Sequence, residues 1–292
     1  MIPKVLPWYP ESLAYQLNLT RREIRRQEVY FKVHNFLVAE TESGAISRQE
    51  AVSMLPVLVL GVEPHHTVLD MCAAPGSKTA QIIEQLHRGE DLPTGLVVAN
   101  DSDNARCYML THQAKRLQSP CVIITNHDAT AMPDMMVPSL DTASLAPMLY
   151  DVPCSGDGTM RKNPEIWTKW NPVNSSNLHG IQYRIARRAL EMLEVGGRMV
   201  YSTCSFHPLE NEAVVARLLQ DMQGRLELVD VKEMLPRLDY SPGLETWTPA
   251  SKQGDLYPSF DSSTFSSSGN LFSSHLADSC PPAWSATSST LW

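Results

Sequence analysis

Residues 68–79 read Val-Leu-Asp-Met-Cys-Ala-Ala-Pro-Gly-Ser-Lys-Thr: an apolar run, then a turn of small residues, then the start of an amphipathic helix. The small side chains let the free backbone N–H groups at the start of the helix approach a ligand closely. The turn matches neither the Gly-x-Gly-x-x-Gly fingerprint nor a Walker P-loop. This segment therefore predicts a strand, a ligand-binding turn and a helix, the first unit of a parallel sheet.

The same alternation of short apolar runs and helix-length segments continues to about residue 230. The further runs are residues 96–99, 122–124, 148–150 and 198–201. Helices are predicted at residues 79–86, 104–117, 178–193 and 211–219. The pattern predicts an α/β fold with a doubly wound, mostly parallel, Rossmann-like sheet.

Two segments fall outside this pattern, so three regions are predicted. Residues 1–57 form a proline-rich and helical segment that we expect to pack on the α/β domain, which spans residues 58–248. Residues 249–292 are rich in serine and have no apolar period, which predicts disorder. The first predicted helix carries Leu17, Ile24 and Val29. Between them lie four arginines, which could meet phosphates or simply form a solvated face: Arg21, Arg22, Arg25 and Arg26.

Composition narrows the function classes. The chain has 292 residues, 43% hydrophobic and 19% charged, which excludes a fibre or a repeat array. A net charge of −8 argues against a globally basic nucleic-acid coat, although a local basic surface stays open. No apolar stretch approaches about 18 residues, and we expect a soluble, intracellular protein. The six cysteines lack Cys-x-x-Cys and zinc spacing, which predicts reduced thiols and no metal.

Carboxylates stand at the ends of four predicted strands, namely Asp70, Asp101, Asp128 and Asp151. Ligands of open parallel sheets bind beyond the carboxyl ends of the strands. An Asp after the second strand is placed to bind a ribose diol, which fits an unphosphorylated nucleoside. A single strand-end Asp is commonly only a turn-former, but the repetition at one sheet edge favours a binding site.

Two cysteines follow predicted strands closely. Cys154 lies in Asp-Val-Pro-Cys-Ser-Gly at residues 151–156, and Cys204 lies in Tyr-Ser-Thr-Cys-Ser at residues 201–205. At such a strand end the facing helix starts make the edge electropositive, which favours a thiolate. Either cysteine alone could be an inert core residue. Two of them on adjacent loops of one nucleoside pocket favour a chemical role.

Residues 70–79, 151–162 and 201–205 together resemble the signature motifs of the Sun-domain family of S-adenosylmethionine-dependent RNA cytosine-C5 methyltransferases. Residues 40–56 and 161–163 are similar to its eukaryotic NSUN-type tRNA methyltransferase branch. The resemblance covers about residues 8–247. It implies RNA, most often tRNA, as the substrate, with no DNA or membrane partner. It also implies residence in the nucleus or nucleolus, with the cytoplasm as an alternative, and it leaves the oligomeric state open.

The resemblance implies a role for each motif. Carbon 5 of cytosine is a poor nucleophile, so its methylation needs a thiolate that adds to C6 and makes C5 enamine-like. The family's Thr-Cys cysteine, here Cys204, is that nucleophile, and its Pro-Cys cysteine, here Cys154, assists release after methyl transfer. Asp151 is implied to lie near the cofactor and the base, and Lys78 is implied to contact the target base.

The implied cofactor is S-adenosylmethionine, lying along the turn, with Asp101 on its ribose hydroxyls and Asp128 beside its adenine. The full set of implied cofactor-binding residues is Cys72, Ala73, Ala74, Pro75, Gly76, Ser77, Lys78, Asp101, Asp128 and Asp151. A base inside a stem cannot reach such a pocket, so the target cytosine must lie in a loop or be flipped out. Five basic residues could hold the surrounding phosphates, although a solvated helix face explains the last three better: Arg161, Lys162, Arg184, Arg187 and Arg188.

Two departures from the family pattern leave alternatives open. Residues 143–150 differ from the family's Tyr-Asp-Arg-Ile-Leu, and Pro147 predicts a fourth strand that is shortened or shifted in register. Nothing like the family's terminal apolar strand follows residues 226–229, and the tail reads as an unrelated replacement, so an incomplete sheet edge is expected. A catalytically impaired, truncated isoform that only binds RNA or a partner is therefore the main alternative. A small-molecule methyltransferase of the same fold is a weaker one.

Overall fold

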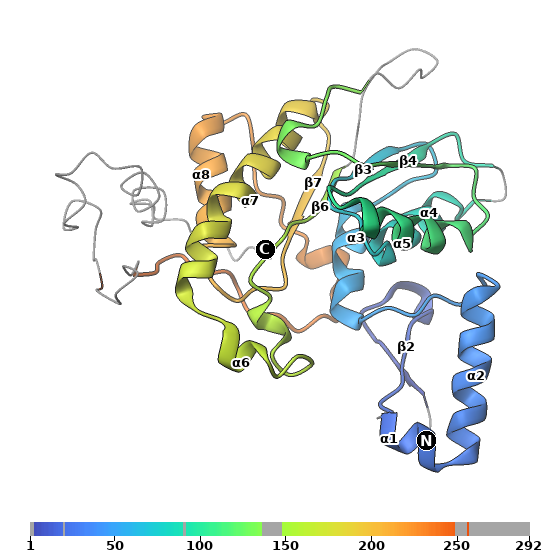
Figure 1. Cartoon of the computed structure of the whole chain (residues 1–292). Coiled ribbons are helices and arrows are strands. Elements are labelled where there is room, and N and C mark those ends of the chain that lie inside the picture. Colours follow the sequence, from blue (N-terminus) through green and yellow to red (C-terminus); the bar gives the residue numbers. More distant parts are fainter. Residues whose placement is uncertain (1–2, 20, 90–91, 136–147, 249–255, 257–292) are drawn as a thin grey trace.

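The computed structural model describes residues 3–19, 21–89, 92–135, 148–248 and 256. Its central feature is a five-stranded, fully parallel sheet in the order β5-β4-β3-β6-β7 (Figure 1). The strands are β3 (Thr67–Asp70), β4 (Leu96–Asn100), β5 (Val122–Thr125), β6 (Met148–Asp151) and β7 (Met199–Ser202). From β3 the chain builds outward to β4 and β5, and then returns to the other side of β3 as β6. This reversal is the topological switch point of a doubly wound sheet, which confirms the predicted fold class.

Helices cover both faces of the sheet (Figure 1). On one face lie α3 (Leu55–Leu60), α4 (Ser77–Leu86) and α5 (Asn104–Lys115), and on the other lie α7 (Pro172–Met192) and α8 (Glu212–Met222). The short helix α6 (Ile166–Lys169) precedes α7. The third helix was predicted to start at residue 178, and that start is wrong. The side chain of Asn171 accepts a hydrogen bond from the Asn174 N–H and Pro172 occupies the first turn, so the helix begins earlier.

Neighbouring strand residues point to opposite faces and build two cores. Val68 and Val97 pack with the α3 and α4 side, together with the fully buried Leu149 of β6. Leu69 and Val98 pack on the opposite face, against α7. Parallel strands buried on both faces read as continuous apolar runs, and this explains why the runs located the strands so closely.

We expect Leu149→Ala to lower the free energy of unfolding by about 2–5 kcal/mol, because it leaves a cavity in a close-packed core. Leu92→Ala is the matched control, since Leu92 is 77% exposed and its truncation should change stability by less than about 0.5 kcal/mol. Urea unfolding of both variants measures the difference. Equal losses would contradict the assignment of Leu149 to the core.

The amino-terminal segment differs from its prediction. Strands β1 (Lys4–Val5) and β2 (Tyr15–Gln16) pair antiparallel, and two helices follow, α1 (Arg21–Arg26) and α2 (Glu28–Glu42). Leu17 precedes both helices, and Gln27 in an extended conformation separates them, so a single helix carrying Leu17, Ile24 and Val29 is wrong. The exposed Arg22, Arg25 and Arg26 fit the solvated-face alternative.

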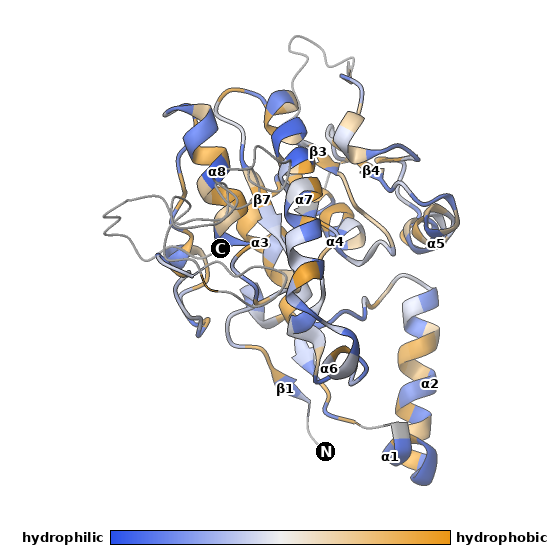
Figure 2. Cartoon of the chain, turned by 60° about the vertical axis from the view of Figure 1, so that its left-hand side comes forward, coloured by the Kyte–Doolittle hydropathy of each residue, from blue (hydrophilic) through white to orange (hydrophobic). Residues whose placement is uncertain are grey.

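Contacts that join this segment to the α/β domain include a hydrogen bond and an ion pair. Arg116 Nη1 donates to the Thr41 carbonyl at 2.8 Å, and Arg88 pairs with Glu11 at 3.6 Å. Helix α2 stands at the edge of the molecule with hydrophobic as well as hydrophilic bands, and its Phe31 is 51% exposed (Figure 2). The predicted boundaries of the three regions stay predictions.

Within the described residues, β7 is an edge strand of the sheet, and β6 is the one strand that pairs with it. Strand β6 has four described residues, as many as β3, β5 and β7, and it begins directly after the undescribed residues 136–147, so the predicted shortening or change of register of the fourth strand stays a prediction. Pro147, on which that prediction rested, lies outside the described residues, as does the serine-rich tail at residues 249–292 except for Leu256. Across the described parts of the chain, every helix is too short or too polar to cross a membrane.

Candidate active site

The two predicted cysteines meet at the carboxyl edge of the sheet. Strands β6 and β7 pair in parallel with Asp151 opposite Ser202, so the loops that follow them leave the sheet side by side. The Sγ atoms of Cys154 and Cys204 lie 3.2 Å apart, and the backbone N–H of Cys204 points to Cys154 Sγ at 3.3 Å. The pairing of β6 with β7 thus brings together two cysteines that lie fifty residues apart in the sequence.

The pair is electrostatically asymmetric. The hydrogen bond with Cys154 lowers the pKa of the Cys204 thiol, while the same bond, aided by burial, raises the pKa of Cys154. Cys204 is also the more exposed of the two. The arrangement therefore favours a Cys204 thiolate that accepts a hydrogen bond from a protonated Cys154, with Cys204 open to a substrate.

A glycine allows the two loops to approach so closely. Gly158 donates its N–H to the Cys204 carbonyl at 2.9 Å, and a Cβ on Gly158 would lie 2.7 Å from that oxygen. Any side chain would therefore push the Cys204 loop away. Sequence reasoning missed this residue, although it lies inside the motif at residues 151–162.

A lysine and a carboxylate form an ion pair beside the thiols. Lys78 Nζ lies 2.5 Å from Asp151 Oδ2 and 3.3 Å from Ser53 Oγ, and the other oxygen of Asp151 accepts a hydrogen bond from Ser202 Oγ at 3.0 Å. Both charges act on Cys204, the carboxylate raising the pKa of its thiol and the ammonium lowering it. The structure thus brings Lys78, Asp151, Cys154 and Cys204 together, as predicted. Ser53 and Ser202 were missed, because a lone serine carries no spacing signal.

The turn at residues 72–76 is held by its neighbours on β4 and α5. Gly76 has a left-handed φ of +106°, and a Cβ there would meet Leu110 Cδ1 at 2.9 Å. Ala73 donates its N–H to the Asn100 carbonyl at 2.7 Å. Burial raises the pKa of the Cys72 thiol, so Cys72 stays protonated and is a poor nucleophile. The chain beyond Gly76 enters α4 through Ser77 and Lys78.

Asp101 organises the turn from the end of β4. Its Oδ2 accepts the Ala74 N–H at 3.2 Å and pairs with Arg106 Nη1 at 3.3 Å, and its Oδ1 accepts the Asp103 N–H at 3.0 Å. Arg106 in turn donates to the Ala74 carbonyl at 2.5 Å. The predicted ligand carboxylate is thus also a structural one, and the contribution of Arg106 was missed.

Asp128, the last predicted ligand carboxylate, lies on the next loop. Its Oδ1 caps the short 3₁₀ helix η3 (Ala129–Ala131) by accepting the Thr130 N–H at 2.8 Å and the Thr130 hydroxyl at 2.9 Å. These hydrogen bonds lower the pKa of Asp128, so the exposed carboxylate is ionised at neutral pH. An ionised acceptor at this sheet edge fits a ligand that offers hydrogen-bond donors.

Asp70 at the end of β3 is buried, and burial raises the pKa of its carboxyl to about 7. Thr79 Oγ1 donates to its Oδ2 at 2.7 Å, whereas Oδ1 has no hydrogen-bond partner within the described residues. In the unfolded chain the same carboxyl titrates near 4, so the unfolded state loses its proton first and stability falls as the pH rises from about 4 to 7.

Asp70→Asn is expected to remove this loss, because the amide stays neutral at every pH. The wild type should lose stability relative to the variant as the pH rises. The difference between their free energies of unfolding should change by a few kcal/mol at most between about pH 4 and pH 7 and then level off. Urea unfolding of both proteins across this range measures the difference. Parallel curves would contradict the raised pKa of Asp70.

The basic residues near the site divide into two groups. Arg161 and Lys162 are exposed on the loop after Cys154, and Lys162 pairs with Glu50 at 2.8 Å. On α7, by contrast, Arg188 donates to the Met132 carbonyl and to Asp134, both at 2.6 Å. Arg184 is exposed on the same helix. The solvated-face alternative therefore suits α7 better than phosphate binding.

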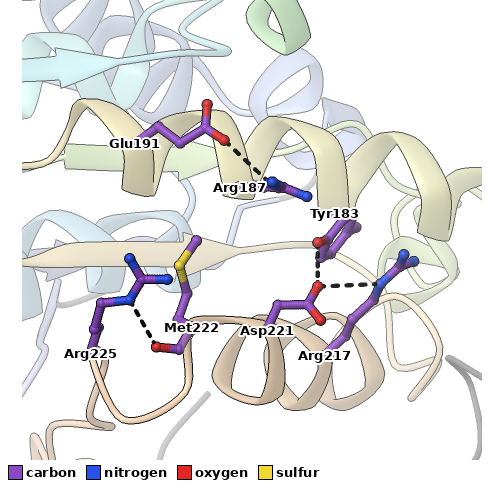
Figure 3. Close-up of a pocket in the computed structure, with 7 residues that line it drawn as sticks. All are labelled: Tyr183, Arg187, Glu191, Arg217, Asp221, Met222 and Arg225. Carbon is purple, nitrogen blue, oxygen red and sulfur yellow. Dashed lines mark hydrogen bonds and ion pairs between the residues drawn. The ribbon is translucent and has the colours of Figure 1, made fainter.

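A surface hollow of about 480 Å³ lies between α7 and α8, and Figure 3 shows the residues that line it. Its three arginines already have partners. Arg187 pairs with Glu191 at 3.2 Å, and Arg225 Nε donates to the Met222 carbonyl at 3.2 Å. Arg217 pairs with Asp221 at 3.9 Å and lies over the ring of Tyr183, whose centroid is 3.8 Å from the guanidinium carbon. None of its lining residues belongs to the cysteine loops. Within the described residues, moreover, no group of three or more His, Cys, Asp or Glu side chains is placed to hold a metal ion.

Comparisons with known proteins find RNA methyltransferases. A family model described as 16S rRNA methyltransferase RsmB/F matches residues 57–257. A tRNA (cytosine(34)-C(5))-methyltransferase of Drosophila melanogaster is 58% identical over 260 residues, 87% of this chain and 35% of the relative. A multisite-specific tRNA:(cytosine-C(5))-methyltransferase of Saccharomyces cerevisiae is 51% identical over 250 residues, 84% of this chain and 36% of the relative. The chain thus spans about a third of the length of these curated relatives.

A solved structure is similar as well. The crystal structure of NSun6 from Pyrococcus horikoshii with SFG has a TM-score of 0.58 and 27% sequence identity. The likeness covers 70% of this chain and 48% of that one. The match lies in the α/β fold described above.

Proposed function

Because this chain belongs to the 16S rRNA methyltransferase RsmB/F family, we propose that it transfers a methyl group from S-adenosylmethionine to carbon 5 of a cytosine in tRNA. The tRNA substrate is proposed from the curated relatives, whose names specify tRNA (cytosine-C5) methylation. The methyl donor is proposed from the family and from the neighbour solved with SFG, an S-adenosylmethionine analogue. One observation on this chain carries the proposal: the thiol pair in which Cys204 is the exposed, activated partner.

The residues of the turn suit this donor. A nucleoside that carries an amino acid needs hydrogen-bond acceptors for its hydroxyl and amino groups rather than phosphate-binding cations. Asp101 and Asp128 supply acceptors at the ends of β4 and β5, and Asp70 Oδ1 is a buried oxygen still open to a donor among the described residues. Residues 72–78 with Asp101, Asp128 and Asp151 would hold the cofactor. When bound, it supplies an electrophilic methyl group.

The two cysteines have different roles in the proposed covalent chemistry. The Cys204 thiolate forms a bond to C6 of the cytosine, and the electron pair of the C5=C6 double bond moves to C5, which becomes nucleophilic. Lys78, held by Asp151, is positioned to support the charge that develops on the base. After methylation a base must accept the C5 proton, the electrons of the C5–H bond re-form the C5=C6 bond, and the C6–S bond breaks with its electron pair returning to the Cys204 sulfur. Once Cys204 is bonded to C6, the hydrogen bond that raises the pKa of Cys154 is lost and Cys154 can give its proton to solvent. We assign the Cys154 thiolate as the acceptor of the C5 proton, since its sulfur lies 3.2 Å from Cys204 Sγ.

A basic surface next to the site supports an RNA substrate. A hollow of about 700 Å³ is lined by Arg48, His112, Arg116 and Lys162, together with Thr41, Glu42 and Gln113. Lys162 lies on the loop that follows Cys154, so the hollow adjoins the loop of the thiol pair. Lys162 pairs with Glu50, and Arg116 donates to the Thr41 carbonyl. Arg48 and His112 add further positive or titratable groups, so in a chain with a net charge of −8 the cluster can attract phosphates that the overall charge would repel.

Covalent trapping tests the proposal. The protein is incubated with S-adenosylmethionine and tRNA that contains 5-fluorocytosine, in which fluorine replaces the proton that must leave, so the adduct cannot break down. A protein band of higher mass that disappears after RNase treatment is expected, and it should depend on S-adenosylmethionine. No adduct from protein that is folded by circular dichroism would overturn the proposal in favour of a chain that only binds RNA or a partner.

A further inference from the structure

Glu210 is a fully buried carboxylate between the two cysteine loops. It lies on the segment that joins β7 to α8. Burial acts to raise the pKa of Glu210, but hydrogen bonds, first among them those from Ser155, outweigh burial and lower it. The side chain is therefore ionised at neutral pH inside the protein. Burying a charge costs free energy unless hydrogen bonds compensate the lost contact with water, so the donors to this carboxylate are the groups that keep it buried.

Four hydrogen bonds with ordinary geometry reach the carboxylate from the described residues, two on each oxygen, and the Ser175 hydroxyl also acts to lower its pKa. Oε2 accepts the Ser155 N–H at 2.8 Å and Gln182 Nε2 at 3.0 Å. Oε1 accepts the hydroxyl of Ser155 at 2.5 Å and the hydroxyl of Ser205 at 3.0 Å. These four donors are neutral, so they hold the charge by direction and distance rather than by an opposite charge.

The donors flank the reactive thiols. Ser155 directly follows Cys154, and Ser205 directly follows Cys204. Gln182 also donates to the Pro153 carbonyl at 2.9 Å, so the Cys154 loop is fixed on both sides of the cysteine. One carboxylate thus bridges two loops that lie fifty residues apart in the sequence.

We propose that Glu210 is a positioning residue that holds Cys154 and Cys204 at their hydrogen-bonding separation, so that the two thiols can act in succession on one base. The part of this inference that concerns catalysis rests on the proposed function. The part that concerns the spacing of the two thiols does not depend on any substrate. The same carboxylate serves both steps, because the bond to Ser205 orients the nucleophile and the bonds to Ser155 orient the residue that assists release.

The neighbouring Glu212 offers a matched control. It is also buried, and its Oε1 accepts the Leu244 N–H at 2.9 Å. Glu210→Gln and Glu212→Gln make the same chemical change two residues apart. Glu210→Gln places an NH₂ group against donors that need an acceptor, whereas Glu212→Gln keeps an amide oxygen for its one donor.

The first measurement needs no RNA. Dibromobimane becomes fluorescent when it bridges two thiols that lie close together, and Cys204→Ala supplies the background from the other cysteines. Bridging in Glu210→Gln is expected to be about tenfold slower or more, as for loss of hydrogen bonds to a charged group, and unchanged within about twofold in Glu212→Gln. Equal bridging in Glu210→Gln and the wild type would overturn the inference, whatever the outcome of trapping.

Step-specific variants decide the case even if Glu210→Gln does not fold. Ser205→Ala removes the tether beside Cys204 and should slow adduct formation with 5-fluorocytosine tRNA by about tenfold. Ser155→Ala removes the hydroxyl tether beside Cys154 and should slow release from ordinary tRNA more than it slows adduct formation. Equal slowing of both steps in both variants would mean a merely structural network and would overturn the inference. If the wild type forms no adduct, the proposed function fails alone, and the bridging result still decides the role of Glu210 in spacing the thiols.

Discussion

A Cys204→Ala variant is expected to form no covalent complex with 5-fluorocytosine tRNA and to lose methyl transfer by at least about 10⁴-fold. Methylation at C5 requires prior addition of a nucleophile at C6, and among the described cysteines Cys204 alone is exposed. Its pKa is lowered, whereas burial raises the pKa of Cys72 and of Cys107. Replacing its sulfur therefore removes the step on which every later step depends.

The measurement is the mass shift of the protein on a denaturing gel, with transfer of labelled methyl groups as the quantitative readout. Cys121→Ala is the matched control, since Cys121 lies beside β5 and its sulfur faces the Pro93 carbonyl at 3.9 Å. This control should keep transfer within about twofold of the wild type, as surface-like substitutions do. If Cys204→Ala retained transfer within about tenfold of the wild type, a thiolate at Cys204 would not be the nucleophile.

The roles proposed for the two cysteines depend on a balance of opposing hydrogen bonds. The Cys204 N–H points at Cys154 Sγ, which by itself would favour a thiolate on Cys154. The thiol–thiol bond and burial act more strongly in the other direction and raise the pKa of Cys154. Exposure agrees, because a nucleophile must reach the base while a proton carrier need only touch the reacting atoms. The geometry therefore supports the assignment that the resemblance implied.

The sequence located the strands and the thiol loops because their signals are local. Each strand is a short apolar run, and each cysteine follows such a run directly, so parallel pairing alone brings Cys154 and Cys204 to one edge. The early start of α7 could have been read from Asn171 and Pro172, which are an N-cap and a first-turn proline. The break at Gln27 has no such marker.

The residues that support the site escaped detection for a physical reason. Glu210 reaches Ser155 across 55 sequence positions and Ser53 reaches Lys78 across 25, and neither contact produces a periodic pattern. Asp101 was found at the end of β4, but its bond to the Ala74 N–H depends on how the turn folds back over the strand. A sequence pattern places residues at an edge of the sheet, and only the packed chain shows which of them hold the others in place.

The second large effect is expected for Cys154→Ala, which should form the covalent adduct and complete one methyl transfer. It should release the product about 10²–10⁴-fold more slowly, the range for loss of a positioned acid or base. The protein should therefore accumulate as a covalent complex with ordinary tRNA, whereas the wild type turns over. Denaturing gels at several times after mixing measure the complex, and equal turnover of variant and wild type would remove Cys154 from the release step.

The same variant has a pH signature that separates its two roles. Removing the Cys154 thiol removes the hydrogen bond that lowers the pKa of Cys204, so the Cys204 pKa should rise toward that of an ordinary cysteine. Adduct formation in Cys154→Ala should then be slower than in the wild type near pH 7 and should recover as the pH rises through about 8–9, because the thiolate is the reacting form. Cys154→Ser, whose hydroxyl can still donate to the thiolate, should keep the profile of adduct formation closer to that of the wild type while release stays slow. A release defect that disappeared at high pH together with the adduct defect would mean that Cys154 only activates Cys204.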